Sequence, residues 1–165
     1  LDGYRAGLAE AGLAPARQLI AQGYFTYRSG LDAAEQLLAL QEPPTAIFAS
    51  NDDMAAATVA VAHRLGLDVP ADLTVCGFDD TALATTISPE LTTIRQPITD
   101  MSRKAVQMLI DEIRRRRAND PAEHPHTLLE FQLIRRQSDA APRRRPRPLH
   151  GKAGRTRRVA TEPMR

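Results

Sequence analysis

Apolar residues along the chain follow two periodicities, one typical of amphipathic helices and one typical of buried strands. The first run places Leu1, Tyr4 and Leu8 at helical spacing and stops at Gly12. Short continuous apolar runs then alternate with helical patterns, which predicts strands alternating with helices. In chain order the elements predicted up to residue 78 are a helix at 1–11, a strand at 17–22, a helix that begins after Ser29 as its N-cap, a strand at 45–50, a helix at 53–65 and a strand at 73–78.

Beyond residue 78 the pattern is less regular and contains the longest predicted helix. We expect a short helix at 81–86, an extended segment at 91–96, a helix at 99–117 and a last strand at 127–135. The long helix ends in four consecutive arginines, which suit the negative end of the helix dipole and are expected to be solvated. One stripe of this helix is apolar and contains Met101, Ala105, Met108, Leu109 and Ile113.

The alternation of strands and helices places the chain in the α/β class, with an open, parallel, doubly wound sheet. A length of 165 residues is enough for one domain with a proper core, and 42% hydrophobic with 25% charged residues is ordinary for a soluble globular protein. No stretch approaches the roughly 20 apolar residues that span a bilayer. Because the first helix has no N-cap at Leu1, we expect that the natural polypeptide continues upstream.

The formal net charge of +2 is distributed very unevenly. Residues 143–165 hold nine of the 22 basic groups and one of the 20 acidic groups. The preceding 142 residues carry 13 basic and 19 acidic groups, a net charge of −6. Affinity for nucleic acid is built largely from Lys and Arg that neutralise phosphates, so this acidic body is a poor candidate for DNA contact. The segment 141–165 is predicted to be a disordered basic tail, because it contains almost no large apolar residues.

Polar or aromatic residues follow three successive predicted strands. They are Phe25 after the first, Asn51 after the second and Asp79 after the third. In an open parallel sheet the carboxyl ends of the strands share one edge, and ligands bind in the crevice outside that edge. We therefore expect these three residues to face one cleft.

These three residue types suit a neutral, polyhydroxylated ligand. An aromatic ring offers a flat apolar face to a sugar, an amide offers a donor and an acceptor, and a carboxylate accepts hydrogen bonds from two hydroxyls. Structural roles remain open for all of them at this stage: Asn51 and Asp52 are equally suited to cap the following helix, Phe25 to fill a core, and Asp79 with Asp80 to form a turn.

Catalytic chemistry finds little support. Cys76 lies inside an apolar strand with no histidine within local reach, which is typical of a structural thiol. The chain has no glycine-rich phosphate loop of either common kind, and the lysines, Lys104 and Lys152, do not follow a predicted strand. We predict a protein that is not an enzyme, with no cofactor, no metal site and no catalytic residues.

Several blocks, in order, resemble the effector-binding domain of the lactose/galactose repressor (LacI/GalR) family of bacterial transcription regulators. They are 44–55, with the sequence PTAIFASNDDMA, 66–80, 89–97, the helical block 101–110, and the closing Arg-Arg-Gln-Ser at 135–138. The resemblance covers about residues 1–140.

The resemblance implies a two-lobed, periplasmic-binding-protein-like fold with an effector between the lobes. Residues 1–90 and 127–135 would belong to the C-terminal lobe, and 91–117 would cross into the N-terminal lobe. The rest of that lobe and the helix-turn-helix domain would lie outside this chain. The stripe of the 99–117 helix would then lack its normal partner, so we predict that it is docked opportunistically, exposed or paired with another chain.

The resemblance also assigns roles to residues. Phe25 matches the ring-stacking aromatic, Asn51 a polar contact of sugar-binding members, and Asp79 the carboxylate that holds the effector; Gln96 is a further, weaker candidate. A family arginine that contacts the effector would precede Leu1. With half of the cleft outside the chain, we expect the chain alone to bind effector poorly or not at all.

The function expected from the resemblance is effector sensing in a cytoplasmic, homodimeric repressor. The effector would be a small sugar more readily than a purine, and operator DNA would be bound only through the helix-turn-helix domain. The dimer contact would involve Ala56, Val59, Ala60 and Ile87, although helix-on-sheet packing explains these residues equally well. A periplasmic sugar-binding protein of a transporter is the alternative, and nonspecific nucleic-acid binding by the tail is a third possibility.

Overall fold

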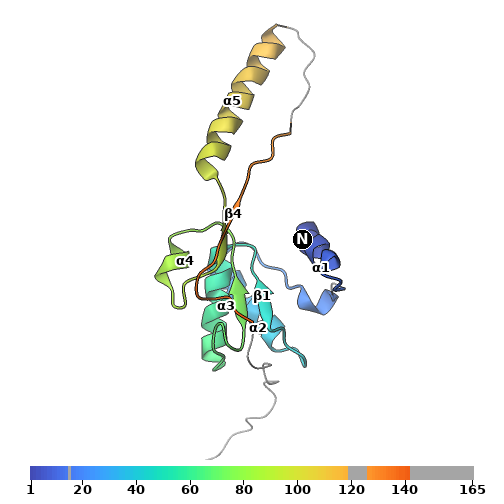
Figure 1. The fold of residues 1–165 in the computed structure, drawn as a ribbon, viewed down its shortest axis with the longest axis vertical. Helices are drawn as coiled ribbons and strands as arrows, with labels where there is room; N and C mark the ends of the chain where they lie inside the picture. The colour runs from blue at the N-terminus through green and yellow to red at the C-terminus, as the bar shows by residue number, and fades with distance from the viewer. Residues whose placement is uncertain (15, 119–125, 142–165) are drawn as a thin grey trace, which may run out of the picture.

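Two helices, α2 (Tyr27–Leu38) and α3 (Asp52–Arg64), pack against each other beside a short parallel sheet (Figure 1). The computed structural model describes residues 1–14, 16–118 and 126–141. The predicted disordered tail, apart from its first residue, lies outside these ranges.

The sheet confirms the predicted α/β class. Strand β1 (Ala46–Phe48) pairs in parallel with β2 (Thr74–Cys76), with Ile47 opposite Val75. Isolated parallel bridges, Cys76 with Thr92 and Asp79 with Arg95, then join the end of β2 to the segment containing β3 (Thr93–Arg95). Parallel pairing of β1 with β2 places the ends of both strands at one edge, as the sequence predicts.

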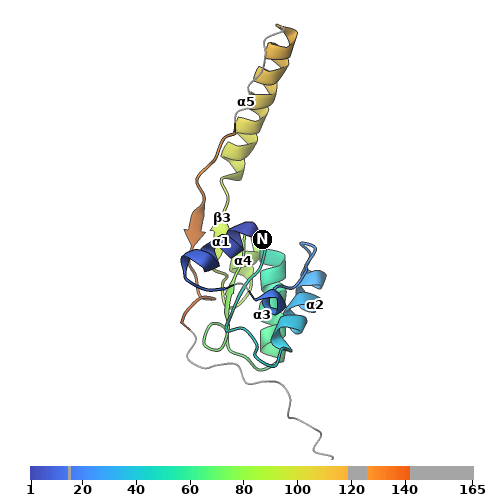
Figure 2. The same ribbon diagram turned by 90° about the vertical axis from the view of Figure 1, so that its right-hand side faces the viewer.

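The chain leaves this sheet along β3 and returns along β4 (Gln132–Ile134), which pairs with β3 in antiparallel register. Between them, α5 (Ile98–Arg117) projects away from the rest of the described chain (Figures 1 and 2). No residue of α5 is buried, and Met101, Leu109 and Ile113 are at least two-fifths exposed. The prediction that its apolar stripe lacks a full partner is therefore confirmed.

The predicted strand at 17–22 is wrong. Residues Arg17–Leu19 form a 3₁₀ turn, η1, in which Leu19 and Ile20 donate backbone hydrogen bonds to Ala16 and Arg17. A strand exists through pairing, and these bonds turn the backbone over the first half of the predicted segment. The chain straightens again after Leu19 but makes no ladder with another described strand.

Helix α2 begins three residues earlier than predicted. Thr26 is the N-cap: its Oγ1 accepts from the backbone N–H of Ser29 at 3.1 Å, while Ser29 Oγ accepts from the N–H of Thr26 at 3.4 Å. This is a capping box, in which Ser29 takes the N3 position usually held by Glu or Gln. Ser29 is thus part of the cap without being the N-cap.

The remaining helices are α1 (Asp2–Glu10), which has no buried residue and stands apart from the α2–α3 pair, and the single turn α4 (Leu83–Thr86). The core lies between α2, α3 and the sheet. Its fully buried apolar residues include Leu38, Val61, Leu73, Val75 and Leu91.

Candidate functional site

Asn51 occupies the N-cap of α3 at the end of β1, and both ends of its amide are used there. Its Oδ1 accepts from the backbone N–H of Met54 at 3.0 Å, and its Nδ2 donates to the backbone carbonyl of Phe25 at 3.1 Å. The side chain is buried. The capping role left open by the sequence is therefore present, and the same amide draws the Phe25 loop to the start of α3.

Phe25 is not a core residue. The residue is 67% exposed, and its backbone has a φ of 58°, in the left-handed region that a phenylalanine rarely adopts. The Asn51 amide holds the carbonyl of this residue. An exposed ring fixed on an unfavourable backbone is a feature found at ligand sites, where the surrounding structure maintains the strain.

Asp79 and Gln96 meet at the end of β2. Gln96 Nε2 donates to Asp79 Oδ1 at 2.6 Å, and both residues are half-buried. Asp79 has a φ of 114°, and the next residue, Asp80, has a φ of 58°. The described chain has three non-glycine residues with positive φ, namely Phe25, Asp79 and Asp80, and they flank the same sheet edge.

The Asp52 carboxylate accepts hydrogen bonds from two other segments at this edge of the sheet. Its Oδ2 accepts from the backbone N–H of Thr81 at 2.7 Å and from Thr81 Oγ1 at 3.1 Å, and its Oδ1 accepts from Thr93 Oγ1 at 2.6 Å. The residue is fully buried. One carboxylate thus joins the start of α3, the turn after Asp80 and β3.

Asp80 carries a second network. Its Oδ2 accepts from Arg95 Nε and its Oδ1 from Arg136 Nη2, each at 2.6 Å. Burial acts to raise the pKa of Asp80, but the hydrogen bonds from Arg136 and Arg95 outweigh it and hold that pKa below its ordinary value. Asp80 is therefore ionised throughout the physiological range.

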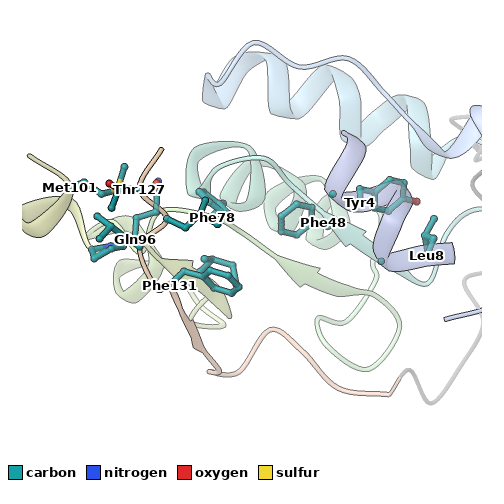
Figure 3. Close-up of a pocket in the computed structure, with 14 residues that line it drawn as sticks. Tyr4, Leu8, Phe48, Phe78, Gln96, Met101, Thr127 and Phe131 are labelled. Atoms are coloured by element: carbon teal, nitrogen blue, oxygen red, sulfur yellow. The ribbon is translucent and has the colours of Figure 1, made fainter. Parts of the chain in front are cut away.

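Two cavities open along the sheet beside α1. One, of about 640 Å³, is lined by Phe25, Ser50 and Phe78 among others. The second, of about 670 Å³, is mainly apolar and contains Gln96 (Figure 3). In Figure 3 the rings of Phe48, Phe78 and Phe131 lie along the sheet, with Tyr4 and Leu8 of α1 at one end. Asn51 and Asp79 line neither cavity, so the four predicted residues do not share one enclosed pocket.

The residues predicted at a dimer contact lie on α3 and after α4. Ala56 and Val59 are buried within the chain, whereas Ala60 and Ile87 are half-buried. Their role at a dimer contact stays a prediction.

Neither a nucleophilic thiol nor a metal cluster is found in the described part of the chain. Burial raises the pKa of the Cys76 thiol, an effect reinforced by the Asp139 carboxylate, and so disfavours a nucleophilic thiolate. Among the described residues no cluster of three potential metal ligands occurs.

The sequence did not predict the contacts of two aspartates. Asp52 is suited by its position to cap a helix, but it anchors Thr81 and Thr93; Asp80 is suited to a turn, but it binds Arg95 and Arg136. Both partner sets come from segments far along the chain, which spacing alone does not bring together. The available signal was Arg136, within the closing Arg-Arg-Gln-Ser block.

A family model described as a periplasmic binding protein-like domain matches residues 1–138. The HTH-type transcriptional repressor CytR of Escherichia coli strain K12 is 38% identical over 141 residues, which cover 86% of this chain and 40% of CytR. The chain thus spans about two-fifths of the length of this curated relative.

Solved structures of transcriptional regulators are also similar to this chain. A complex of the transcriptional regulator CelR with cellobiose superimposes with a TM-score of 0.76 at 34% identity, over 83% of this chain and 41% of CelR. A sugar-binding transcriptional regulator of the LacI family from Escherichia coli, in complex with phosphate, gives 0.70 at 36% identity, over 85% and 49%. The fold and the sequence blocks are therefore both similar to those of transcriptional regulators.

Proposed function

The chain belongs to the LacI family of transcriptional regulators through its periplasmic binding protein-like domain, and on this premise we propose that it is the effector-sensing part of a repressor. The relatives and structural neighbours are regulators of transcription, which favours this function over a transporter binding protein or an enzyme. Operator DNA would be bound by a helix-turn-helix domain in the part of such proteins that this chain does not match. The acidic body is a poor candidate for DNA contact, which agrees with DNA binding by a separate domain.

One observation carries the proposal: residues suited to a sugar lie in two contacting pairs at one edge of the sheet, on constrained backbone. Asn51 links the Phe25 loop to α3, and Asp79 meets Gln96 at the neighbouring strand end. Phe25 and Asp79 both hold left-handed φ values. Strain of this kind costs on the order of 1–3 kcal/mol per residue and persists where function demands a fixed geometry.

We assign the effector contacts as follows. The exposed Phe25 ring stacks on the ligand, and the Asp79 carboxylate accepts hydrogen bonds from its hydroxyls in place of, or together with, the Gln96 amide. Because Asn51 is occupied by Met54 and Phe25, its main contribution is to position Phe25, with one amide hydrogen left to offer a ligand. A small saccharide fits this set better than a purine, since a carboxylate beside an amide matches vicinal hydroxyls.

The protein would act as a homodimer through the side of α3 that carries the half-buried Ala60 and through the segment at Ile87, and α5 would pack its stripe on an N-terminal lobe. Residues 91–117 would form the crossover between lobes. No helix in the described part of the chain is long and apolar enough to cross a membrane. We place the protein in the cytoplasm because a repressor meets its operator there.

A thermal-shift panel tests the ligand class. The complete gene product would be screened against mono- and disaccharides, with cellobiose among them, and against nucleobases and nucleosides. We expect at least one saccharide at 100 times its Kd to stabilise the folded state by about 2.7 kcal/mol and so raise Tm by several degrees. Asp79→Asn should abolish the shift, whereas Asp32→Asn, the same change on the exposed face of α2, should retain it. A shift with purines alone would contradict the assignment of a sugar.

A further inference from the structure

The turn that carries Asp79 is held at both ends by segments that are distant in sequence. Asp79 donates its backbone N–H to Ile94 at 2.9 Å, which fixes the turn to β3. On the far side, Thr81 is bound to the buried Asp52 carboxylate. Between these two anchors, Asp79 and Asp80 have φ values that cost energy in any residue other than glycine. The turn is therefore constrained at both ends, and Asp80 lies at its centre.

Asp80 joins two strands that run in opposite directions. Arg95, which binds one carboxylate oxygen, lies on β3, and Arg136, which binds the other, lies just beyond the end of β4. Arg136 also donates from Nη1 to the carbonyl of Leu91 at 2.8 Å, so it spans from the return strand to the start of the outgoing one. A single carboxylate thus connects the outgoing and returning strands at the base of the ribbon, which we define as 92–96 with 132–136.

Burial makes the two halves of this connection unequal. The side chains of Asp80 and Arg136 are 7% and 12% exposed, whereas Arg95 is 51% exposed. Charge-assisted hydrogen bonds are stronger where water is excluded, and a buried charge that loses its partner is costly. The Arg136 half should hold firmly, and the Arg95 half should yield first when β3 moves relative to the turn.

The ribbon is also the connection between the sheet and α5. Helix α5 begins directly after Gln96 and Pro97, and β4 brings the chain back (Figures 1 and 2). Gln96, the last residue of the outgoing strand segment, donates to the Asp79 carboxylate. A change in the angle of the ribbon would therefore move the arginines that bind Asp80 and the Gln96 amide that binds Asp79.

We propose that Asp80 is a positioning residue that fixes the ribbon to the Asp79 turn, so that the orientation of α5 and the orientation of the Asp79 carboxylate are coupled. The inference rests on the proposed function in that Asp79 is the effector contact. Effector binding at Asp79 then changes how often the ribbon occupies each of its orientations. The Asp80 fork, meaning Asp80 with Arg95 and Arg136, determines how strongly the ribbon and the Asp79 carboxylate move together.

Hydrogen exchange followed by mass spectrometry tests, without any ligand, whether Asp80 fixes the ribbon to the turn. Asp80→Asn keeps the shape of the side chain but removes the charge that two arginines share. We expect amide exchange across the ribbon to accelerate by about tenfold, while α2 and α3 keep their protection. Asp32→Asn, which removes an exposed carboxylate paired with Arg28, should leave the ribbon unchanged. An unchanged ribbon, or equal acceleration throughout the chain, would overturn the proposal.

A second variant covers the case in which Asp80→Asn does not fold. Arg95→Gln removes the exposed half of the fork and leaves the buried Asp80–Arg136 pair intact. We expect a smaller acceleration, about threefold, confined to the ribbon. If exchange there stays at the wild-type rate, the fork does not hold the ribbon.

The side-chain amide of Gln96 reports on the coupling, again without ligand. Its NMR signals should show the hydrogen bond to Asp79 in the wild type and move toward those of a free glutamine in Asp80→Asn or Arg95→Gln. Signals that stay in place while the ribbon loosens would refute the coupling. Because neither readout uses a saccharide, a failure of the saccharide panel would count against the proposed function alone.

Discussion

Under the proposed function, individual residues at the sheet edge divide into those that would contact a ligand and those that hold these contact residues in place. Phe25 and Asp79 belong to the first group: one has an exposed ring, and the other a half-buried carboxylate. Asn51, Asp52 and Asp80 belong mainly to the second, because their polar atoms already bind the backbone or side chains of neighbouring segments. Polar residues that follow strands at one edge therefore do not have one common role.

Among these residues, we expect the replacement of Asp52 to lower the free energy of unfolding most. Asp52→Ala would leave the backbone N–H of Thr81 and the buried hydroxyl of Thr93 without their acceptor. The free energy of unfolding should fall by about 3 kcal/mol. Urea denaturation gives the value. Asp53→Ala, the adjacent position on the same helix, should cost about 0.5 kcal/mol through the helix dipole. Similar losses for the two variants would show that the Asp52 network does not stabilise the fold.

At this scale the sequence predicted the positions of the candidate residues better than their contacts. Asn51 and Asp79 were correctly placed at one edge of the sheet, since that placement depends only on strand direction. The contact of Asn51 with the carbonyl of Phe25 was not predictable, because it depends on the left-handed turn at Phe25. Side-chain partners 26 or more residues apart are determined by three-dimensional packing, which local pattern does not encode.

Among the elements, α2 and α3 approach each other closely at Gly30. A Cβ there would lie 2.7 Å from Met54 Cα and 2.8 Å from Ala57 Cβ, so the helices must separate to admit it. This close approach keeps α3, and with it the Asn51 cap, against the loop that carries Phe25. The glycine is required by packing, since its backbone is ordinary helix.

Gly30→Ala should therefore destabilise the protein in spite of the higher helix propensity of alanine. We expect a loss of about 2 kcal/mol from overpacking. Gly7→Ala is the matched control: Gly7 lies within α1, and an added Cβ would meet nothing within 4 Å, so alanine should be neutral or stabilising there. Thermal denaturation by circular dichroism compares them. A Gly30→Ala variant as stable as wild type would contradict the close packing of α2 on α3.

The elements themselves were mostly predictable because their patterns are local. The long helix predicted at 99–117 is observed as Ile98–Arg117, and the helix at 53–65 as Asp52–Arg64. The strand predicted at 17–22 failed because an apolar run does not reveal whether a pairing partner is in reach. The start of α2 was misplaced because Ser29 and Thr26 are both good caps, and Thr26 is the N-cap because it forms the reciprocal pair.

For the whole molecule, the uneven charge and the extended shape point to the same organisation. The acidic body, residues 1–142, contains the candidate site, and within it α5 extends away from the sheet with its apolar stripe exposed. We assign to the body the detection of a ligand, and to the ribbon the transmission of that event toward α5. We assign DNA recognition to a separate domain.

The central claim is that a saccharide binds at the edge marked by Phe25 and Asp79. Isothermal titration of the complete gene product with the best saccharide from the panel tests it most directly, using Phe25→Ala and Tyr24→Ala as a matched pair. The two residues are 67% and 73% exposed, so removal of their rings should affect stability to a similar degree, and Tyr24 lines neither cavity. We predict that Phe25→Ala weakens binding by about tenfold, the worth of a stacked ring, while Tyr24→Ala stays within about twofold. Equal effects of the two variants, or full affinity in Phe25→Ala, would contradict the claim.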